Sequence, residues 1–316
     1  MEVLALDIGG TNARIGLLEA KGKKISLKEK RIFSTKNVYN IPKLINGFGK
    51  NAERACFAVA GPIAGKKAKL TNADLTIDIS KVKKETRLKH VALVNDFHAN
   101  AAALPFLRKS DIFALNKGSA KDGIKMVIGA GTGLGKSYVI DGKIFPSEGG
   151  HTIVGVEDID EYALVDYIKK KIKGTVCYED VLSGRGISAI YEYLEIKSNL
   201  TMNGRMHRLI QEAKYKPEII TENYKKDKLS GLAVRLFVKF YARFARDSAL
   251  NTLCSEIYLA GGIAKAIKDP MKEGFMKEFL NHRHYSSLLK KMKVALVMNP
   301  DIGLIGAGAI AAGLQK

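Results

Sequence analysis

The sequence contains 316 residues, of which 46% are hydrophobic and 27% are charged, so the chain can bury a core and is not generally disordered. Its length allows one large domain or two ordinary ones. Lys and Arg number 52 against 32 Asp and Glu, a net charge of +20, but the lysines are dispersed in short groups without an aromatic-basic or zinc motif, which favours a solvated surface over a specific nucleic-acid partner.

Short apolar runs near the start of the chain predict strands that glycine and tight turns separate. Gly9-Gly10 separates the first strand from the second, and Gly61-Pro62 ends the fourth. A helix is predicted over 97–104, because Pro105 would stop it. The predicted strands are 3–6, 13–18, 25–33, 56–60 and 91–94.

The order of strand, glycine turn, strand, tight turn and strand returns near residue 125. This repeat in organisation predicts two related lobes. Downstream of Asp160, apolar residues spaced three and four apart predict mainly helices. The strands predicted in this half are 126–128, 136–140, 143–145, 257–260 and 294–297, and the helices are 162–172, 232–253 and 302–315.

Cysteine usage and the lack of targeting signals predict a cytoplasmic chain. Cys56, Cys177 and Cys254 are far apart and form no C-x-x-C pair, which argues against a disulfide framework or a structural zinc site. The first residues lack the basic region of a signal peptide, and the longest apolar stretch, 302–314, is too short to span a bilayer. We therefore expect no membrane partner, and we assign the cysteines to packing or surface.

The segment Asp7-Ile8-Gly9-Gly10-Thr11-Asn12 is a candidate phosphate site. Two glycines let the backbone turn sharply after a strand, and such a turn can wrap a phosphate with its N–H groups. Asp7 could hold Mg²⁺ through water, since Mg²⁺ prefers one or two carboxylates together with phosphate oxygens. A plain hairpin turn is the alternative.

A second glycine-rich segment runs from Gly129 to Ser137. It nearly matches the Walker A spacing, but that motif requires a following helix, and the residues after Lys136 favour a strand. We interpret the segment as a second phosphate-binding hairpin rather than as a P-loop.

Polar residues follow several other predicted strands or lie on loops. Asn95-Asp96 ends a buried strand just before a helix, where a carboxylate can accept a proton from a substrate hydroxyl; helix capping is an equally good explanation. Glu148-Gly149-Gly150-His151 and Glu179 could bind the hydroxyls of a polyhydroxyl ligand, although a lone loop histidine is more often structural. At Gly261-Gly262 the backbone could approach a base or a ribose.

Together these segments resemble the bacterial-type glucokinase family of the actin and hexokinase superfamily, over most of the chain. The resemblance implies an α/β, two-lobed actin/hexokinase-like (ribonuclease H-like) fold. It also implies an active-site cleft between a small α/β domain, residues 1–106 plus 299–316, and a large one, residues 107–298. The segments that carry it are LDIGGTNAR (6–14), VNDF (94–97), 129–135, SEGGH (147–151), VLSG (181–184), AGGI (260–263), Asn299-Pro300 and GLIG (303–306).

The resemblance implies an ATP-dependent sugar kinase of glycolysis that acts on glucose. Asp96 would be the general base for the sugar 6-hydroxyl, and Asp7 would act on Mg²⁺ through water. The residues implied to bind the sugar are Asn95, Asp96, Glu148, His151 and Glu179. Those implied to bind ATP are Asp7, Gly9, Gly10, Thr11, Asn12, Gly131, Thr132, Gly133, Gly261 and Gly262.

One departure and several alternatives qualify this assignment. The related repressor-and-kinase family carries a Cys-x-Cys-Gly-x-x-Gly-Cys zinc motif after the histidine that corresponds to His151, and this chain lacks it, which argues against that branch. A broader hexose or amino-sugar kinase, a non-catalytic sugar-binding regulator, and polyphosphate as donor stay open. The resemblance suggests a homodimer.

Overall fold

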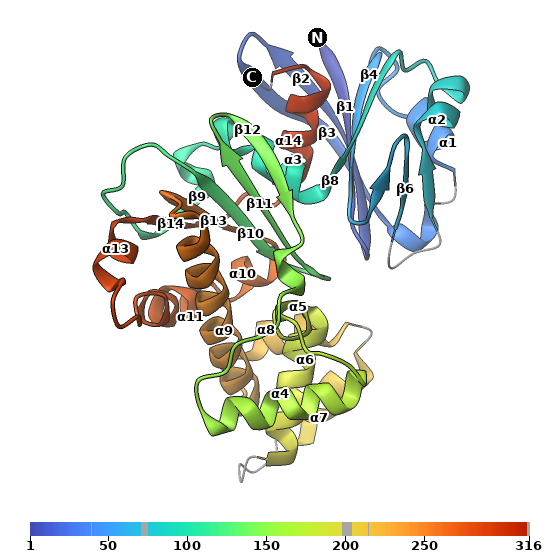
Figure 1. Ribbon diagram of the computed structural model, residues 1–316. Coiled ribbons are helices and arrows are strands. Elements are labelled where there is room, and N and C mark those ends of the chain that lie inside the picture. The colour runs from blue at the N-terminus through green and yellow to red at the C-terminus, as the bar shows by residue number, and fades with distance from the viewer. Residues whose placement is uncertain (39, 71–74, 198–203, 214, 315–316) are drawn as a thin grey trace. The chain divides into compact units, whose positions relative to one another are not determined.

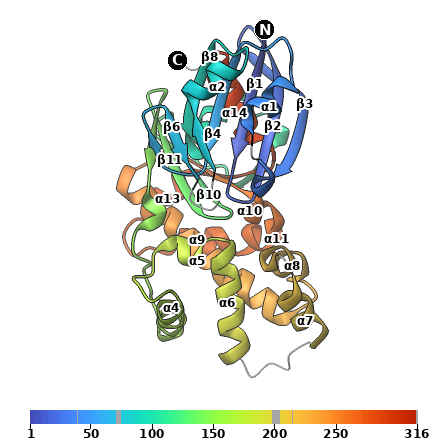
Figure 2. The ribbon, with the colours of Figure 1, turned by 90° about the vertical axis from the view of Figure 1, so that its right-hand side faces the viewer.

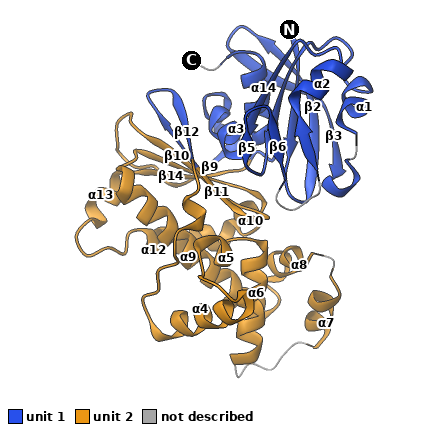
Figure 3. Cartoon of the chain, turned by 45° about the vertical axis from the view of Figure 1, so that its right-hand side comes forward, with its two compact units in different colours: residues 1–112, 137–146, 299–316 blue, residues 113–136, 147–298 orange. Residues whose placement is uncertain are grey.

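The computed structural model of the protein describes residues 1–38, 40–70, 75–197, 204–213 and 215–314. The chain forms two compact units (Figure 3). Unit 1 comprises Met1–Ile112, Ser137–Pro146 and Asn299–Lys316, and unit 2 comprises Phe113–Lys136 and Ser147–Met298. The domain boundaries implied by the resemblance stay a prediction.

Unit 1 is built on a five-stranded sheet of order β3-β2-β1-β4-β8. The first three strands are antiparallel neighbours, whereas β1, β4 and β8 run parallel. Every strand predicted in this part of the chain is present. The strands are β1 (Glu2–Ile8), β2 (Asn12–Lys21), β3 (Lys24–Ser34), β4 (Arg54–Val59) and β8 (His90–Asn95), and a separate three-stranded sheet contains β5 (Ile63–Ala64), β6 (Lys67–Lys69) and β7 (Thr76–Asp78).

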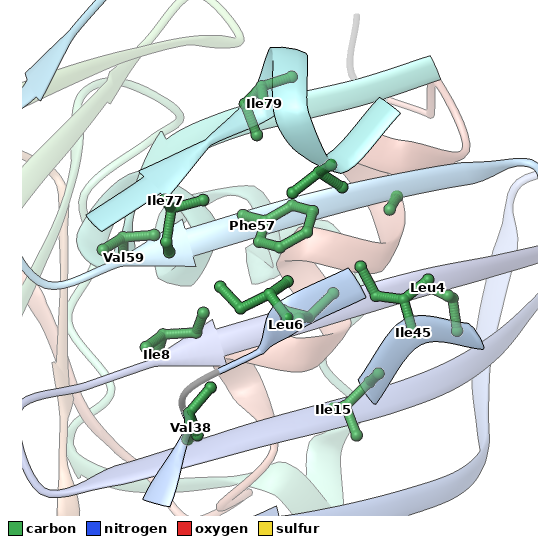
Figure 4. Packing of buried hydrophobic residues seen from close by; sticks show 14 of the residues in the cluster. Leu4, Leu6, Ile8, Ile15, Val38, Ile45, Phe57, Val59, Ile77 and Ile79 are labelled. Atoms are coloured by element: carbon green, nitrogen blue, oxygen red, sulfur yellow. The ribbon is translucent and has the colours of Figure 1, made fainter. Parts of the chain in front are cut away.

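Helices cover both faces of the five-stranded sheet. Leu4, Leu6 and Phe57 point to the face covered by α1 (Ile41–Asn46) and α2 (Ile79–Glu85) (Figure 4). The residues between them on β1 point to the face covered by α3 (Asp96–Ala102) and α14 (Ile302–Ala311). Figure 2 shows α14 behind the sheet. Burial on both faces explains why β1 and β4 read as continuous apolar runs rather than as alternating patterns.

Helix α14 lies in close backbone contact with α3. A Cβ atom built on Gly306 would lie 1.7 Å from the carbonyl oxygen of Ala99. A glycine is therefore required where the two helices meet, since any side chain would push them apart. The small-residue helix predicted over 302–315 is confirmed as far as Ala311, and its last residue lies outside the described residues.

Unit 2 contains most of a six-stranded sheet of order β12-β11-β10-β13-β14-β9. Strand β10 is parallel to β13, which is parallel to β14. The order β12-β11-β10-β13-β14 repeats β3-β2-β1-β4-β8, which confirms the repeat in organisation seen in the sequence. The strands are β9 (Ile112–Asn116), β10 (Lys125–Ala130), β11 (Leu134–Ile140), β12 (Lys143–Ser147), β13 (Glu256–Ala260) and β14 (Lys293–Val297).

The rest of unit 2 is helical, as the sequence predicted (Figure 1). The 25-residue helix α9 is its main buried element, and no helix in the described parts of the chain is long and apolar enough to cross a bilayer. The helices are α4 (Ile159–Ile172), α5 (Tyr178–Val181), α6 (Gly184–Lys197), α7 (Gly204–Glu212), α8 (Lys216–Asn223), α9 (Lys228–Thr252), α10 (Gly262–Ala266), α11 (Lys268–Pro270), α12 (Met276–Phe279) and α13 (Ser286–Lys291).

Gly306→Ala tests the contact between α14 and α3. We expect the variant to lower the free energy of unfolding by about 2–3 kcal/mol, because the added methyl group overpacks a backbone contact. Chemical denaturation followed by circular dichroism measures the effect. Gly204→Ala is the control, since nothing lies within 4 Å of the Cβ position at Gly204. Equal midpoints for wild type and Gly306→Ala would contradict the contact.

Candidate functional site

Unit 1 brings its predicted site residues to the carboxyl edge of the parallel strands. Ile8 is in register with Val59, and Val59 is in register with Asn95. The turn that follows Ile8 and the Asn95-Asp96 pair therefore lie at the same edge of the sheet. Because neighbouring strands are about 4.8 Å apart, two strand spacings separate β1 from β8 by about 10 Å.

The turn from Gly9 to Asn12 is a tight loop that its own backbone holds. The Gly9 N–H donates to the carbonyl of Asn12 at 3.0 Å. Thr35 fastens the loop from outside: its Oγ1 donates to the Gly9 carbonyl at 2.7 Å, and its N–H donates to the Thr11 carbonyl at 3.0 Å. The side chains of Thr11 and Asn12 are exposed. The loop is thus ordered by the protein itself, as a preformed phosphate cradle would be.

Asp7 is a mostly buried carboxylate at the end of β1. Burial raises the pKa of this carboxyl group, and the guanidinium of Arg14, with Nη1 3.2 Å from Asp7 Oδ2, opposes that effect. The C-terminal segment packs tightly against the same carboxylate, because a Cβ atom on Gly303 would lie 2.8 Å from Asp7 Oδ2. A further positive charge at the open side of this carboxylate would stabilise its ionised form.

The Asn95-Asp96 pair forms the start of α3. Asn95 Oδ1 accepts the N–H of Phe97 at 2.8 Å, so Asn95 is the helix cap. Asp96 Oδ1 also accepts that N–H, at 3.0 Å. Capping and a binding role are compatible, because each carboxylate oxygen has a second lone pair and the amide group of Asn95 keeps its two donors.

In unit 2, Glu179 fastens the glycine turn between β10 and β11. Its Oε2 accepts the N–H of Leu134 at 2.9 Å, and its Oε1 accepts from Arg185 Nη2 at 3.1 Å. A Cβ atom on Gly133 would lie 2.6 Å from Glu179 Oε2, so a side chain at this position would displace that carboxylate. The carbonyl of Gly131 accepts the N–H of Gly184 at 2.8 Å, which ties the turn to the start of α6.

The loop that carries Glu148 and His151 packs on β11. A Cβ atom on Gly150 would lie 2.2 Å from the carbonyl oxygen of Leu134, so the loop backbone contacts the strand directly. The side chains of Glu148 and His151 project into solvent, with 88% and 57% of their surface exposed. The sequence therefore placed both residues correctly on an accessible loop.

Lys136, the apparent Walker A lysine, does not serve a phosphate cradle. Lys136 lies within strand β11, and its side chain is buried. Its Nζ lies 3.2 Å from Ser248 Oγ on α9 and over the ring of Phe244. Burial lowers the pKa of this ammonium group. The strand-turn-strand interpretation of the segment is confirmed.

Gly261 and Gly262 have different roles. Gly261 adopts φ +99°, and a Cβ atom there would lie 2.4 Å from the carbonyl oxygen of Ala130, so this glycine is required by the fold. Nothing lies within 4 Å of the Cβ position at Gly262 or at Gly131. Because Gly129 and Ala260 are in register on neighbouring parallel strands, these two open glycines lie at the same sheet edge.

The donor set fits a magnesium ion that its substrate helps to hold. The described residues contain no group of three or more His, Cys, Asp or Glu side chains arranged to bind a metal ion. Asp7 offers one carboxylate beside the Gly9–Asn12 turn, which fits an ion that this carboxylate would hold through water, with phosphate oxygens and water as its direct ligands.

Comparison with known proteins identifies the family. The sequence matches the glucokinase family over residues 4–314. The chain belongs to the glucokinase family. Glucokinases of Nostoc punctiforme and Photorhabdus laumondii are 31% and 30% identical to it; the alignments cover 99% of both chains in the first case, and 96% of this chain and 95% of the relative in the second.

Solved structures show the same fold. The crystal structure of glucokinase from Balamuthia mandrillaris in complex with glucose has a TM-score of 0.82 at 21% identity and covers 99% of this chain and 94% of that chain. Glucokinase from an Antarctic psychrotroph has a TM-score of 0.79 at 24% identity and covers 99% of both chains. The predicted α/β actin/hexokinase-like class is confirmed, and the family makes this protein a sugar kinase, a phosphotransferase with an alcohol group as acceptor.

The structure also shows site contacts that the sequence did not predict. Arg14 pairs with Asp7, and Arg185 pairs with Glu179. Cys177, assigned from the sequence to packing or surface, lies with its Sγ 3.8 Å from Nδ1 of His151. Arg14 and Arg185 belong to or adjoin the quoted motifs, whereas nothing in the sequence pattern pointed to Cys177.

Gly133→Ala tests the attachment of Glu179 to the glycine turn. We expect a loss of about 1–2 kcal/mol in the free energy of unfolding, because the methyl group displaces the Glu179 carboxylate. The matched control Gly131→Ala has open space around its Cβ position and should stay within about 0.5 kcal/mol of wild type. In a Glu179→Ala background the cost of Gly133→Ala should disappear in a double-mutant cycle; an unchanged cost would refute the attachment.

Proposed function

We propose that this protein is a glucokinase that transfers the γ-phosphoryl group of ATP to the 6-hydroxyl of D-glucose. The observation that carries the proposal is the register of β1, β4 and β8, which places Asp96 and the Gly9–Asn12 turn at one sheet edge. Family membership over residues 4–314 and the full-length similarity to curated glucokinases support it.

In the proposed mechanism, Asp96 accepts the proton of the sugar 6-hydroxyl as that oxygen attacks the γ-phosphorus. The bond from the γ-phosphorus to the bridging oxygen of ADP breaks, and the products are ADP and glucose 6-phosphate. The turns at Gly9–Asn12 and Gly131–Gly133 hold the phosphates through backbone N–H groups. Asp7 would hold Mg²⁺ through water, and the bound ion would supply positive charge against the phosphate oxygens.

The sugar is bound by polar side chains that the family resemblance implies. These are Asn95, Glu148, His151 and Glu179, which offer amide, carboxylate and imidazole groups that pair with hydroxyls. A site built from such groups rejects analogues that lack the hydroxyl, since a buried polar partner would then be unpaired. Gly261-Gly262 would line the adenosine, where only Gly262 has open space beside it.

Replacement of the general base tests the assignment of Asp96. We expect Asp96→Asn to lower kcat by about 10²–10⁴-fold while glucose binding is largely kept, because an amide cannot take the proton but can still hydrogen-bond the sugar. Coupled measurement of ADP release, with isothermal titration of glucose, separates the two effects. Asp122→Asn, an exposed aspartate away from the site, is the control. Near-full activity of Asp96→Asn would contradict the assignment of Asp96 as the general base.

The role of Asp7 predicts a changed requirement for Mg²⁺. We expect Asp7→Asn to raise the Mg²⁺ concentration for half-maximal rate by about tenfold or more, because a carboxylate that accepts hydrogen bonds from metal-bound water is lost. A titration of rate against Mg²⁺ at saturating ATP and glucose measures this. A change in glucose KM alone, with an unaltered Mg²⁺ curve, would contradict the role.

The donor, the acceptor and the assembly are parts of the same proposal. A panel of glucose, mannose and glucosamine with ATP or polyphosphate ranks the substrates directly, and we expect ATP with glucose to be the best pair.

Light scattering on the purified protein tests the homodimer, which rests on the family resemblance. Cytoplasmic localisation is supported by the three free cysteines, since none forms a disulfide.

A further inference from the structure

A short hydrogen-bond chain links Asp180 to His151 through Cys177. The thiol of Cys177 donates to Asp180 Oδ2 at 3.1 Å, and the N–H of Cys177 donates to the same oxygen at 2.9 Å. On its other side, Cys177 Sγ lies 3.8 Å from His151 Nδ1. All three residues belong to unit 2.

Backbone pairing fixes this arrangement. Cys177 is paired with Ile153 in an isolated antiparallel bridge, and the N–H of Tyr178 donates to the carbonyl of Thr152 at 2.9 Å. Cys177 also precedes the first residue of α5, where Asp180 closes a capping box. The strand pairing and the helix start therefore hold the backbone of Cys177 beside residues 151–153, and the contacts to Asp180 Oδ2 orient its thiol.

The protons along this chain can be counted. Burial and the hydrogen bond to Asp180 raise the pKa of the Cys177 thiol, so the sulfur keeps its proton. A carboxylate can only accept, so the single S–H points to Asp180. The sulfur can then face His151 only as an acceptor, which requires a hydrogen on Nδ1. In a neutral imidazole, Nε2 is left with its lone pair.

We propose that Cys177 is a positioning residue that holds His151 in its Nδ1–H tautomer, so that Nε2 accepts a hydrogen bond from a sugar hydroxyl. The proposal rests on the proposed function, in which His151 contacts the sugar. The nearest carboxylate oxygen on the other side, Glu148 Oε2, lies 4.0 Å from Nε2, which is beyond hydrogen-bond distance.

The other two cysteines provide matched controls. Cys56 and Cys254 are buried, with 0% and 1% of their surface exposed, and Cys254 belongs to the same unit as His151. Replacing Cys254 therefore removes a thiol from unit 2 without touching the chain from Asp180 to His151.

The first experiment reads the tautomer directly. The full chain is labelled with ¹⁵N-histidine, and long-range ¹H–¹⁵N spectra are recorded at pH 8.5 without substrate, with the His151 signals assigned from His151→Gln. We expect Nδ1 to carry the proton in wild type, in Cys177→Ser and in Cys254→Ala, and Cys177→Ala to shift towards the Nε2–H form. A wild-type protein in the Nε2–H form, or Cys177→Ala with an unchanged spectrum, would overturn the proposal.

The second experiment reads the consequence for the sugar. We expect Cys177→Ala to raise the KM for glucose by about 3- to 10-fold, with kcat and the KM for ATP nearly unchanged, and Cys177→Ser to restore most of the loss. Equal losses in Cys177→Ala and Cys177→Ser, accompanied by lower kcat, would show a merely structural role. Failure of the wild type to phosphorylate glucose would refute the proposed function, whereas the tautomer measurement would still decide the assignment of Cys177.

Discussion

Burial of the central strands on both faces is the constraint on which this structure depends. Strands β1 and β4 lie between α1 and α2 on one face and α3 and α14 on the other, so polar side chains can appear only where these strands end. Asp7 shows the penalty for burying a charged group, because burial raises the pKa of its carboxyl group and the guanidinium of Arg14 opposes that effect only in part. Polar chemistry in unit 1 is thereby concentrated at the carboxyl ends of the parallel strands β1, β4 and β8.

Close approach of backbone segments is the second recurring feature. Gly306 lets α14 meet α3, Gly150 lets a loop lie on β11, and Gly261 lets the chain pass the carbonyl oxygen of Ala130. In each place a Cβ atom would fall within 2.5 Å of a backbone oxygen, which no side chain tolerates. Several of the glycine motifs are therefore explained by packing, whereas nothing lies within 4 Å of the Cβ positions at Gly131 and Gly262.

Site residues in this protein have structural roles as well as proposed chemical ones. Asn95 caps α3, and Glu179 holds the N–H of Leu134 while it pairs with Arg185. Such double use fixes the side chains before a ligand arrives, which lowers the entropy that binding must overcome. A mutation at either position changes the local fold and the chemistry together, so a rate alone does not separate the two effects.

The sequence by itself determined the features that depend on neighbours along the chain. Apolar runs and glycine turns predicted the five strands of the first sheet and every strand of the six-stranded sheet except β9, together with the repeat. The residues after Lys136 excluded a P-loop, because strand pattern and turn chemistry are local. The positions of Asp7, Asp96 and His151 at strand ends or on loops were likewise readable from short motifs.

Only the tertiary structure decided which distant side chains meet. The contact of Cys177 with His151 follows from the pairing of Ile153 with Cys177. The sequence pattern of neither segment predicts that pairing. The burial of Lys136 against α9 joins positions 112 residues apart. Such contacts depend on the register between segments and on the room left by missing Cβ atoms, and both are set by the packing of the whole unit rather than by any short stretch of sequence.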